Sequence, residues 1–289
     1  MYIPNRLKQA IDNKQAIIFI GSGLSARVFT DMGKRYPSWT ELLKKYNEWS
    51  LQNDLINKTE YDMIDEIIGK GNLTIAAEVL RQKSSNTDFG AFFDGIFRND
   101  NRFDHVHNAI LDIPFAYILT TNYDAIIESA YRAKYNSEIP VYTWDQVNMV
   151  NKRINDDDLF LFKLHGTYDR ADTVILAEND YRKLYHKEAF LDTLKSIFIN
   201  KSILFVGFGY NDVAITRIIS NIAYTFEQNN CMHYLLIEKN RYNELEKQYL
   251  LQNDRITVIE YDNPDGSHSE IDTFFSQLKA TVSSKKKLP

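Results

Sequence analysis

Four short stretches of the sequence carry residue types that could bind a ligand or catalyse a reaction. They are residues 21–25 (GSGLS), 120–124 (TTNYD), 165–167 (HGT) and 207–212 (GFGYND), and each follows an apolar run. Glycine turns let a phosphate approach the backbone, while Asn, Asp and His supply hydrogen bonds and a base. Ligands bind beyond the carboxyl ends of parallel strands, so we expect the four stretches to line a single site.

The first stretch is a glycine turn after residues 16–20 (AIIFI), a run with the length and β-branched content of a buried parallel strand. If a helix opens after Gly21-Ser22-Gly23, its N-terminus favours a phosphate, which makes a nucleotide the natural ligand. The order Gly21-x-Gly23-x-x-Ala26 satisfies a dinucleotide-binding fingerprint, but no acidic residue ends a second strand about 20 residues later. An ordinary dehydrogenase is therefore not favoured, and the glycines could also make only a tight turn.

An alternating series of strands and helices must position these stretches. Strands are expected at residues 16–20, 116–120, 159–164, 203–206, 234–237 and 256–259. Helices are expected at residues 5–14, 124–132, 189–199, 213–225, 241–251 and 269–282. This alternation predicts an α/β fold in which a Rossmann-like parallel sheet is flanked by helices.

Residues 38–104 interrupt the alternation with helical signals only. Ser38-Trp39-Thr40-Glu41 has the pattern of a capping box, and helical signals continue through residues 64–68, 73–80 and 89–97. We therefore predict one domain over residues 1–289, with a Rossmann-like core at 1–37 and 105–289 and an inserted helical lobe at 38–104. The aromatic residues of the lobe are interpreted as core or as a subunit contact: Phe89, Phe92, Phe93 and Phe97.

Composition argues against several functional classes. The chain of 289 residues has a formal net charge of -5, so no global basic field indicates a nucleic-acid partner, and we interpret the lysines at 285–287 as a solvated end. The single cysteine, Cys231, excludes an internal disulfide and a zinc ribbon, and His105 and His107 are expected to be ordinary helix residues. The sequence contains no run of about 18 or more apolar residues and no signal-peptide pattern, which predicts a cytoplasmic protein without membrane contact.

In order and spacing, the four stretches resemble the sirtuin family, most closely its bacterial NAD-consuming branch. Gly21-Ser22-Gly23-Leu24-Ser25 is similar to the Gly-Ala-Gly-x-Ser loop that holds the NAD pyrophosphate in that family. Thr121-Asn122-Tyr123-Asp124 is similar to its Gln-Asn-Ile-Asp, in which Asn orients the ribose or a water and Asp contacts the nicotinamide amide. Leu164-His165-Gly166 contains the His-Gly pair of that family, in which the His is the catalytic base. Val206-Gly207-Phe208-Gly209, followed by Asp212, lies where the family has its adenosine-ribose loop.

The resemblance implies the site residues of an enzyme that consumes NAD. Catalysis would rest on Asn122 and His165. NAD would be bound by Gly21, Ser22, Gly23, Ser25, Thr121, Asp124, Gly207, Phe208, Gly209 and Asp212. Protein deacylases of the family also carry a Gly-Ile-Pro-Asp-Phe-Arg run and four zinc-binding cysteines, whereas this chain has Tyr36-Pro37-Ser38-Trp39 and a single cysteine. We therefore expect NAD hydrolysis without zinc or another metal, with an NAD-dependent protein deacylase as the alternative.

The expected reaction needs few protein groups. Breaking the bond between nicotinamide and ribose builds oxocarbenium character on the sugar, and it requires a positioned water and a base that takes a proton. His165 suits the role of base, because an ordinary histidine pKa of about 6.5 lies near working pH. Asn122 would hold the water and the ribose, and Asp124 would bind the carboxamide. The products would be nicotinamide and either ADP-ribose or its cyclic form.

Each of these residues also has an ordinary structural interpretation. His165 could be the partner of a backbone carbonyl, Asn122 and Asp124 could cap a helix, and Gly207 and Gly209 could only relieve crowding at a turn. A further alternative is a non-catalytic subunit that binds NAD or ADP-ribose, and the presence of both Asn122 and His165 argues against it.

Bacterial relatives of this kind commonly act in antiphage defence, where depletion of NAD halts the infected cell. We expect no second domain that senses the trigger, so control would come from homo-oligomerisation or from a partner protein. The resemblance implies a HerA-like ATPase or another defence subunit as that partner.

Overall fold

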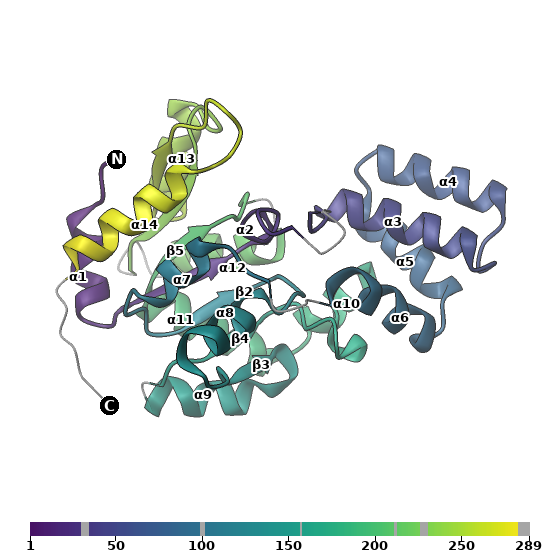
Figure 1. The fold of residues 1–289 in the computed structure, drawn as a ribbon, viewed down its shortest axis with the longest axis horizontal. Helices are drawn as coiled ribbons and strands as arrows, with labels where there is room; N and C mark the ends of the chain where they lie inside the picture. The colour runs from purple at the N-terminus through teal and green to yellow at the C-terminus, as the bar shows by residue number, and fades with distance from the viewer. Residues whose placement is uncertain (30–34, 99–101, 157, 211–212, 226–230, 283–289) are drawn as a thin grey trace.

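The computed structural model describes residues 1–29, 35–98, 102–156, 158–210, 213–225 and 231–282. Within these residues, seven parallel strands form one sheet in the order β3-β4-β2-β1-β5-β6-β7 (Figure 1). The strands are β1 (Ala16–Ile20), β2 (Ile118–Thr120), β3 (Val141–Thr143), β4 (Leu161–Lys163), β5 (Ser202–Val206), β6 (His233–Glu238) and β7 (Ile256–Tyr261). The chain builds the sheet to one side of β1, then returns to its other side at β5. Ligands bind at such a switch point.

The central strands are apolar because helices cover both faces of the sheet. Every residue of β1 and of β5 is buried, and the two strands pair in register, with Ile18 opposite Leu204. Alternate residues of β1 point to opposite faces. Ile18 and Ile20 join one hydrophobic core, and Ile17 and Phe19 join another.

Each core is completed by its own set of helices. On the Ile18 face lie α1 (Asn5–Asp12), α7 (His105–Leu111), α8 (Ile126–Tyr135) and α14 (Glu270–Thr281). On the Phe19 face lie α9 (Val147–Asp156), α10 (Glu178–Tyr185), α11 (Glu188–Asn200), α12 (Val213–Thr225) and α13 (Glu244–Asn253). The predicted α/β class with a Rossmann-like parallel sheet is confirmed. No helix in the described ranges is long and apolar enough to cross a membrane.

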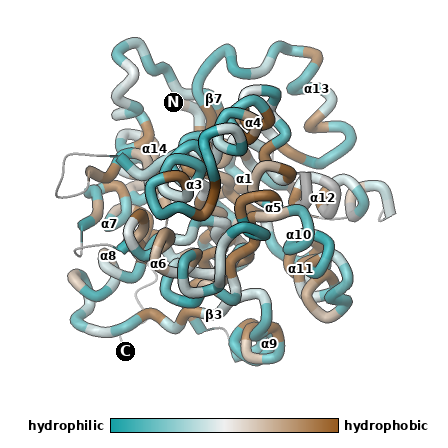
Figure 2. Tube along the Cα trace, turned by 90° about the vertical axis from the view of Figure 1, so that its right-hand side faces the viewer, coloured by the Kyte–Doolittle hydropathy of each residue, from teal (hydrophilic) through white to brown (hydrophobic). Residues whose placement is uncertain are grey.

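Four helices lie together beside the carboxyl ends of the strands (Figure 1). They are α3 (Trp39–Gln52), α4 (Lys58–Gly69), α5 (Leu73–Lys83) and α6 (Asn86–Phe97). The predicted capping box is present, because the Ser38 backbone N–H donates to the Glu41 carboxylate at 2.7 Å and the Glu41 N–H donates to the Ser38 hydroxyl at 3.4 Å. Figure 2, which views the molecule from this side, shows hydrophobic residues of α3 and α5 beside hydrophilic ones.

The aromatic residues of α6 are core residues. Phe89, Phe92, Phe93 and Phe97 are all buried, in a third hydrophobic cluster with Tyr46 of α3. This cluster also includes Ile126 of α8 and Leu176, so the helices at 38–104 share apolar contacts with the rest of the chain. The division of the chain into a core and an inserted lobe remains a prediction.

One strand and two α-helices of the described residues were not predicted from the sequence. Strand β3 has only three residues and follows Pro140, so it leaves no measurable alternation. Helices α9 and α10 each bury a single residue fully, Val150 and Leu184. In α9, Val147, Val150 and Ile154 recur at helical spacing, so the sequence did contain a signal for this helix. In α10, Tyr181 and Leu184 share that spacing and belong to the same core. Strand β3, by contrast, is recognisable only through its pairing with β4.

Candidate functional site

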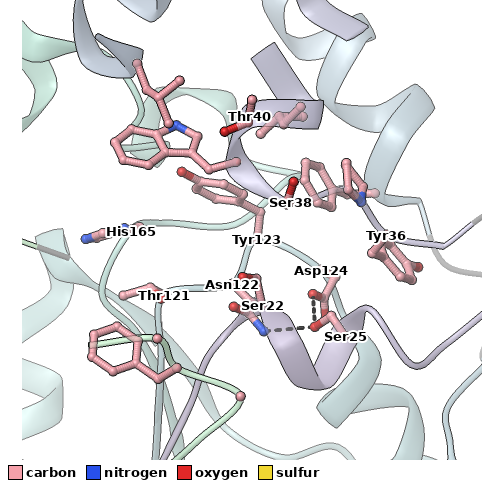
Figure 3. Close-up of a pocket in the computed structure, with 18 of the residues that line it drawn as sticks. Ser22, Ser25, Tyr36, Ser38, Thr40, Thr121, Asn122, Tyr123, Asp124 and His165 are labelled. Carbon is pink, nitrogen blue, oxygen red and sulfur yellow. Dashed lines mark hydrogen bonds between the residues drawn. The ribbon is translucent and has the colours of Figure 1, made fainter. Parts of the chain in front are cut away.

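A cavity of about 300 Å³ opens beyond the carboxyl ends of β1, β2, β4 and β5. This volume is at the lower end of the range for small-molecule sites. Of the predicted residues, the cavity wall contains Ser22, Ser25, Thr121, Asn122, Asp124, His165, Gly207, Phe208 and Gly209 (Figure 3). The structure therefore brings together residues from all four predicted stretches. Asp212 lies outside the described residues.

A chain of side-chain hydrogen bonds connects the first two stretches. The Asn122 Nδ2 donates to the Ser25 Oγ at 2.8 Å, and the Ser25 Oγ donates to the Asp124 Oδ2 at 2.7 Å (Figure 3). All three residues are buried, so the bonds are shielded from competing water. Thr120 holds the base of this loop, because its hydroxyl donates to the Ile20 carbonyl at 2.7 Å and accepts from the Asn122 N–H at 3.0 Å.

The helix-cap interpretation holds for Asp124 and fails for Asn122. The Asp124 Oδ1 accepts from the N–H of Ile126, the first residue of α8, at 3.1 Å. Asp124 therefore caps the helix with one oxygen and accepts from Ser25 with the other. The Asn122 side chain turns away from the helix toward Ser25.

His165 lies across the cavity from Ser25 and Asp124 (Figure 3). It is 4% exposed, and its ring meets the ring of Tyr181 edge-on at a centroid distance of 5.4 Å. Its backbone carbonyl accepts from the Ile175 N–H at 2.9 Å, and the Ile175 carbonyl accepts from the Tyr123 hydroxyl at 2.7 Å. The loop that carries Asn122 therefore also supports the loop that carries His165.

The glycines of the first and last stretches pack backbone against backbone. A Cβ on Gly21 would lie 2.4 Å from the Gly207 carbonyl oxygen, and the Gly23 N–H donates to that oxygen at 2.8 Å. Gly207 has a φ of +63°, and a Cβ there would lie 2.4 Å from the Leu24 nitrogen. Glycine is thus required at these positions because the backbones of the two loops lie too close together for a Cβ. This close approach brings the single-turn helix α2 (Ser22–Ser25) to the cavity, although Gly21 and Gly23 are not themselves lining residues.

A wall of the cavity comes from residues that the sequence analysis did not assign to the site. Tyr36, Pro37, Ser38, Trp39, Thr40, Leu42, Leu73, Phe97, Tyr123 and Tyr181 also line it. Trp39 and Tyr181 lie with their ring centroids 6.4 Å apart, and Tyr36 stacks on Phe97 at 6.1 Å. From the sequence, Tyr36-Pro37-Ser38-Trp39 is a departure from the deacylases and contains the start of the predicted capping box. The aromatic residues of this run, which closely follows the glycine turn in the sequence, were the signal that could have assigned it to the site.

His105 and His107 lie on α7, as predicted. His105 is exposed and contacts the carboxylates of Asp104 and Asp272 at 2.5 and 3.0 Å. Burial lowers the pKa of His107 to about 4. Within the ranges that the structure describes, no group of three or more His, Cys, Asp and Glu is placed to hold a metal ion.

Comparison with known proteins identifies relatives of this chain. Residues 116–259 match the SIR2-like domain. The chain is 28% identical to NAD(+) hydrolase ThsA of Enterococcus faecium, over 95% of this chain and 57% of that protein. It is 26% identical to NAD(+) hydrolase ThsA of Bacillus cereus (strain MSX-D12), over 86% and 48%. It is 30% identical to Defense-associated sirtuin 2 of Bacillus subtilis, over 72% and 19%. The chain spans about half the length of the ThsA relatives that it matches.

Proposed function

We propose that the chain, whose residues 116–259 match the SIR2-like domain in agreement with the predicted resemblance to sirtuins, hydrolyses NAD. The reaction cleaves the bond between nicotinamide and ribose and gives nicotinamide and ADP-ribose. Relatives named NAD(+) hydrolase, which align with most of this chain, support the assignment.

One observation carries the proposal. Asn122, tied to Ser25 and Asp124, and His165 lie on opposite sides of one cavity at the switch point of the sheet. A sugar between them would have an amide on one side and an imidazole on the other. Cleavage of a glycosidic bond by water needs a group that positions the water and a base that takes a proton. The Asn122 amide and the His165 imidazole would supply them.

The proposed mechanism follows from this placement. The electron pair of the glycosidic bond leaves with nicotinamide, and Asn122 holds the water whose oxygen bonds to the anomeric carbon. His165 accepts the proton, either from the water or through a ribose hydroxyl. Asp124 binds the carboxamide of the leaving group.

The remaining predicted residues would hold the rest of NAD. Ser22 and Ser25 would contact the pyrophosphate, with Thr121 beside Asn122. Gly21 and Gly23 would contribute by letting the two loops approach closely, because their N–H groups donate to the Val206 and Gly207 carbonyls. Gly207, Phe208, Gly209 and Asp212 would surround the adenosine ribose. Phe208 is itself packed on Phe19 at a centroid distance of 4.8 Å, so it offers this site a rigid wall.

We further propose that the chain is an antiphage effector that depletes NAD when triggered. The relatives named NAD(+) hydrolase and Defense-associated sirtuin support this role. Homo-oligomerisation and a HerA-like ATPase or another defence subunit are the proposed means of control.

The test is release of nicotinamide from NAD by the wild type, Asn122→Ala and His165→Ala, each alone and in lysate containing the neighbouring gene products. Loss of a positioned base lowers the reaction rate by about 10²–10⁴-fold. Both variants should therefore lose nearly all release of nicotinamide. His186→Ala, which changes an exposed histidine of the segment after α10, should keep it. Binding of NAD without cleavage by the wild type in every condition would favour the binding-subunit alternative, and deacylation of an acetylated peptide would favour the deacylase.

A further inference from the structure

Lys163 is a fully buried cation close to the proposed catalytic base. It ends β4, two residues before His165, and has 0% exposure. Burying an ammonium group is costly unless charged and polar partners surround it. Its presence on a strand that otherwise serves the core therefore calls for an explanation.

The Lys163 ammonium makes three polar contacts, which match its three N–H donors. It donates to the Asp124 carbonyl oxygen at 2.6 Å and to the Thr167 Oγ1 at 3.3 Å. It also pairs with the Glu128 Oε1 at 2.7 Å. One cation thus joins the loop that carries Asn122 and Asp124 to the loop that carries His165.

Glu128 is the counterion in this arrangement. It lies in the first turn of α8, and its side chain is 13% exposed. Burial raises the pKa of the Glu128 carboxyl, and the Lys163 ammonium opposes that rise. A buried ion pair is often no more stabilising than two apolar residues of similar volume, so the pair is not explained by stability alone.

A small cavity places the ion pair next to the site. Its volume is about 10 Å³, which is close to the space of a single water. Lys163 and Glu128 line it together with Ser25, Asn122 and Asp124. The ion pair and the hydrogen-bonded site residues therefore line one small void, and Ser25, Asn122 and Asp124 line both this void and the cavity of the proposed NAD site.

We propose that Lys163 is a positioning residue for the cleavage of NAD: with Glu128 as its counterion, it fixes the Asp124 carbonyl and so sets the placement of Asn122 relative to His165. This inference rests on the proposed function. A displacement of about 1 Å in such a site can cost roughly 10²-fold in rate. Lys163 itself does not line the cavity where NAD would bind, so the effect should fall mainly on kcat. A smaller rise in KM is expected, because the Asp124 that Lys163 holds does line that cavity.

The decisive variant removes both charges. Lys163→Met alone leaves Glu128 buried without its counterion and should destabilise the fold. Lys163→Met combined with Glu128→Leu should unfold at a clearly higher urea concentration than Lys163→Met alone, because neither member of the ion pair is left without its partner. Its kcat for nicotinamide release should still fall by roughly 10²-fold, with KM changed less than about threefold.

A second ion pair provides the matched control. Lys247 and Glu260 pair at 2.8 Å between α13 and β7, away from the cavity. Lys247→Met with Glu260→Leu should leave kcat and KM unchanged. Hydrogen exchange of the backbone amides of residues 122–124 should be faster in the Lys163/Glu128 double variant and unchanged in the control.

Two results would overturn the inference. The first is a stable Lys163/Glu128 double variant whose kcat stays within about threefold of the wild type. The second is unchanged amide exchange at residues 122–124 in that variant. Failure of the wild type and of the Lys247/Glu260 control to release nicotinamide would instead contradict the proposed function, and amide exchange would then still decide whether Lys163 holds the loop.

Discussion

The Asn122 side-chain amide donates to the Ser25 hydroxyl at 2.8 Å, although the two residues are 97 positions apart in the sequence. Ser25 ends the single-turn helix after β1, and Asn122 follows β2. The Ser25 hydroxyl also donates a hydrogen bond to the Asp124 carboxylate. This one hydroxyl therefore orients two side chains of the loop after β2, Asn122 and Asp124. The glycine turn therefore positions the proposed catalytic amide.

Replacing Ser25 tests this relationship. Ser25→Ala leaves the buried Asn122 amide and Asp124 carboxylate without their shared partner, so the free energy of unfolding should fall by about 1–3 kcal/mol. The kcat for nicotinamide release should fall roughly 10- to 100-fold because Asn122 is no longer held in place. Urea unfolding and steady-state kinetics measure the two effects. Ser196→Ala, at an exposed position of α11, is the control. A rise in KM alone, with unchanged stability and kcat, would show that Ser25 only contacts the substrate.

Gly207 tests the close approach of the two glycine loops. Gly207→Ala combines a positive φ with a Cβ 2.4 Å from the Leu24 nitrogen. Backbone strain alone costs about 1–3 kcal/mol, and the clash should add to it. NAD binding should weaken as well, because the loop after β5 must move.

Two other glycines separate strain from crowding. Gly71→Ala, at a φ of +79° with no atom within 4 Å of its Cβ, measures the strain alone. Gly69→Ala, at the end of α4 with equally open space, should stabilise the protein by up to about 1 kcal/mol. Urea unfolding of the three variants should rank Gly207→Ala as the least stable. Equal losses for Gly207→Ala and Gly71→Ala would mean that the packing of the loops adds nothing.

Two buried histidines make stability depend on pH. Burial lowers the pKa of His107 to about 4 and that of His233 to about 3. In the unfolded chain both would titrate near the ordinary value of about 6.5. Below that pH the unfolded chain binds protons that the folded chain does not, so this stability is complete above about pH 6.5 and is lost as pH falls toward 4.

Urea unfolding between pH 7 and pH 4.5 measures this effect. The loss attributable to His107 alone is on the order of 3 kcal/mol when pH reaches its folded pKa. His107→Gln should flatten the dependence below pH 6.5, whereas His186→Gln, at an exposed position, should not change it. Identical slopes for His107→Gln and the wild type would contradict the assignment.

The sequence by itself located six of the seven strands that the structure describes, all but β3, together with the four loops that line the cavity. Residues 16–20 form the strand at the predicted bounds, because a buried parallel strand must be apolar along its whole length and a glycine pair ends it. The same local signals located Asn122, Asp124, His165 and Gly207, whose positions depend only on where each strand ends.

Only the tertiary structure decided which of these residues meet. The bonds from Asn122 to Ser25 and from Lys163 to Asp124 cross between strands that are distant in sequence, so they depend on the order of strands in the sheet. Lys163 in a run of apolar residues carries no local sign of its partner Glu128. Trp39 likewise lines the cavity from the start of α3, and Tyr181 lines it from α10, two helices that are far apart in the sequence. Local patterns encode elements and their ends, whereas contacts between elements follow from topology, which no short stretch of sequence contains.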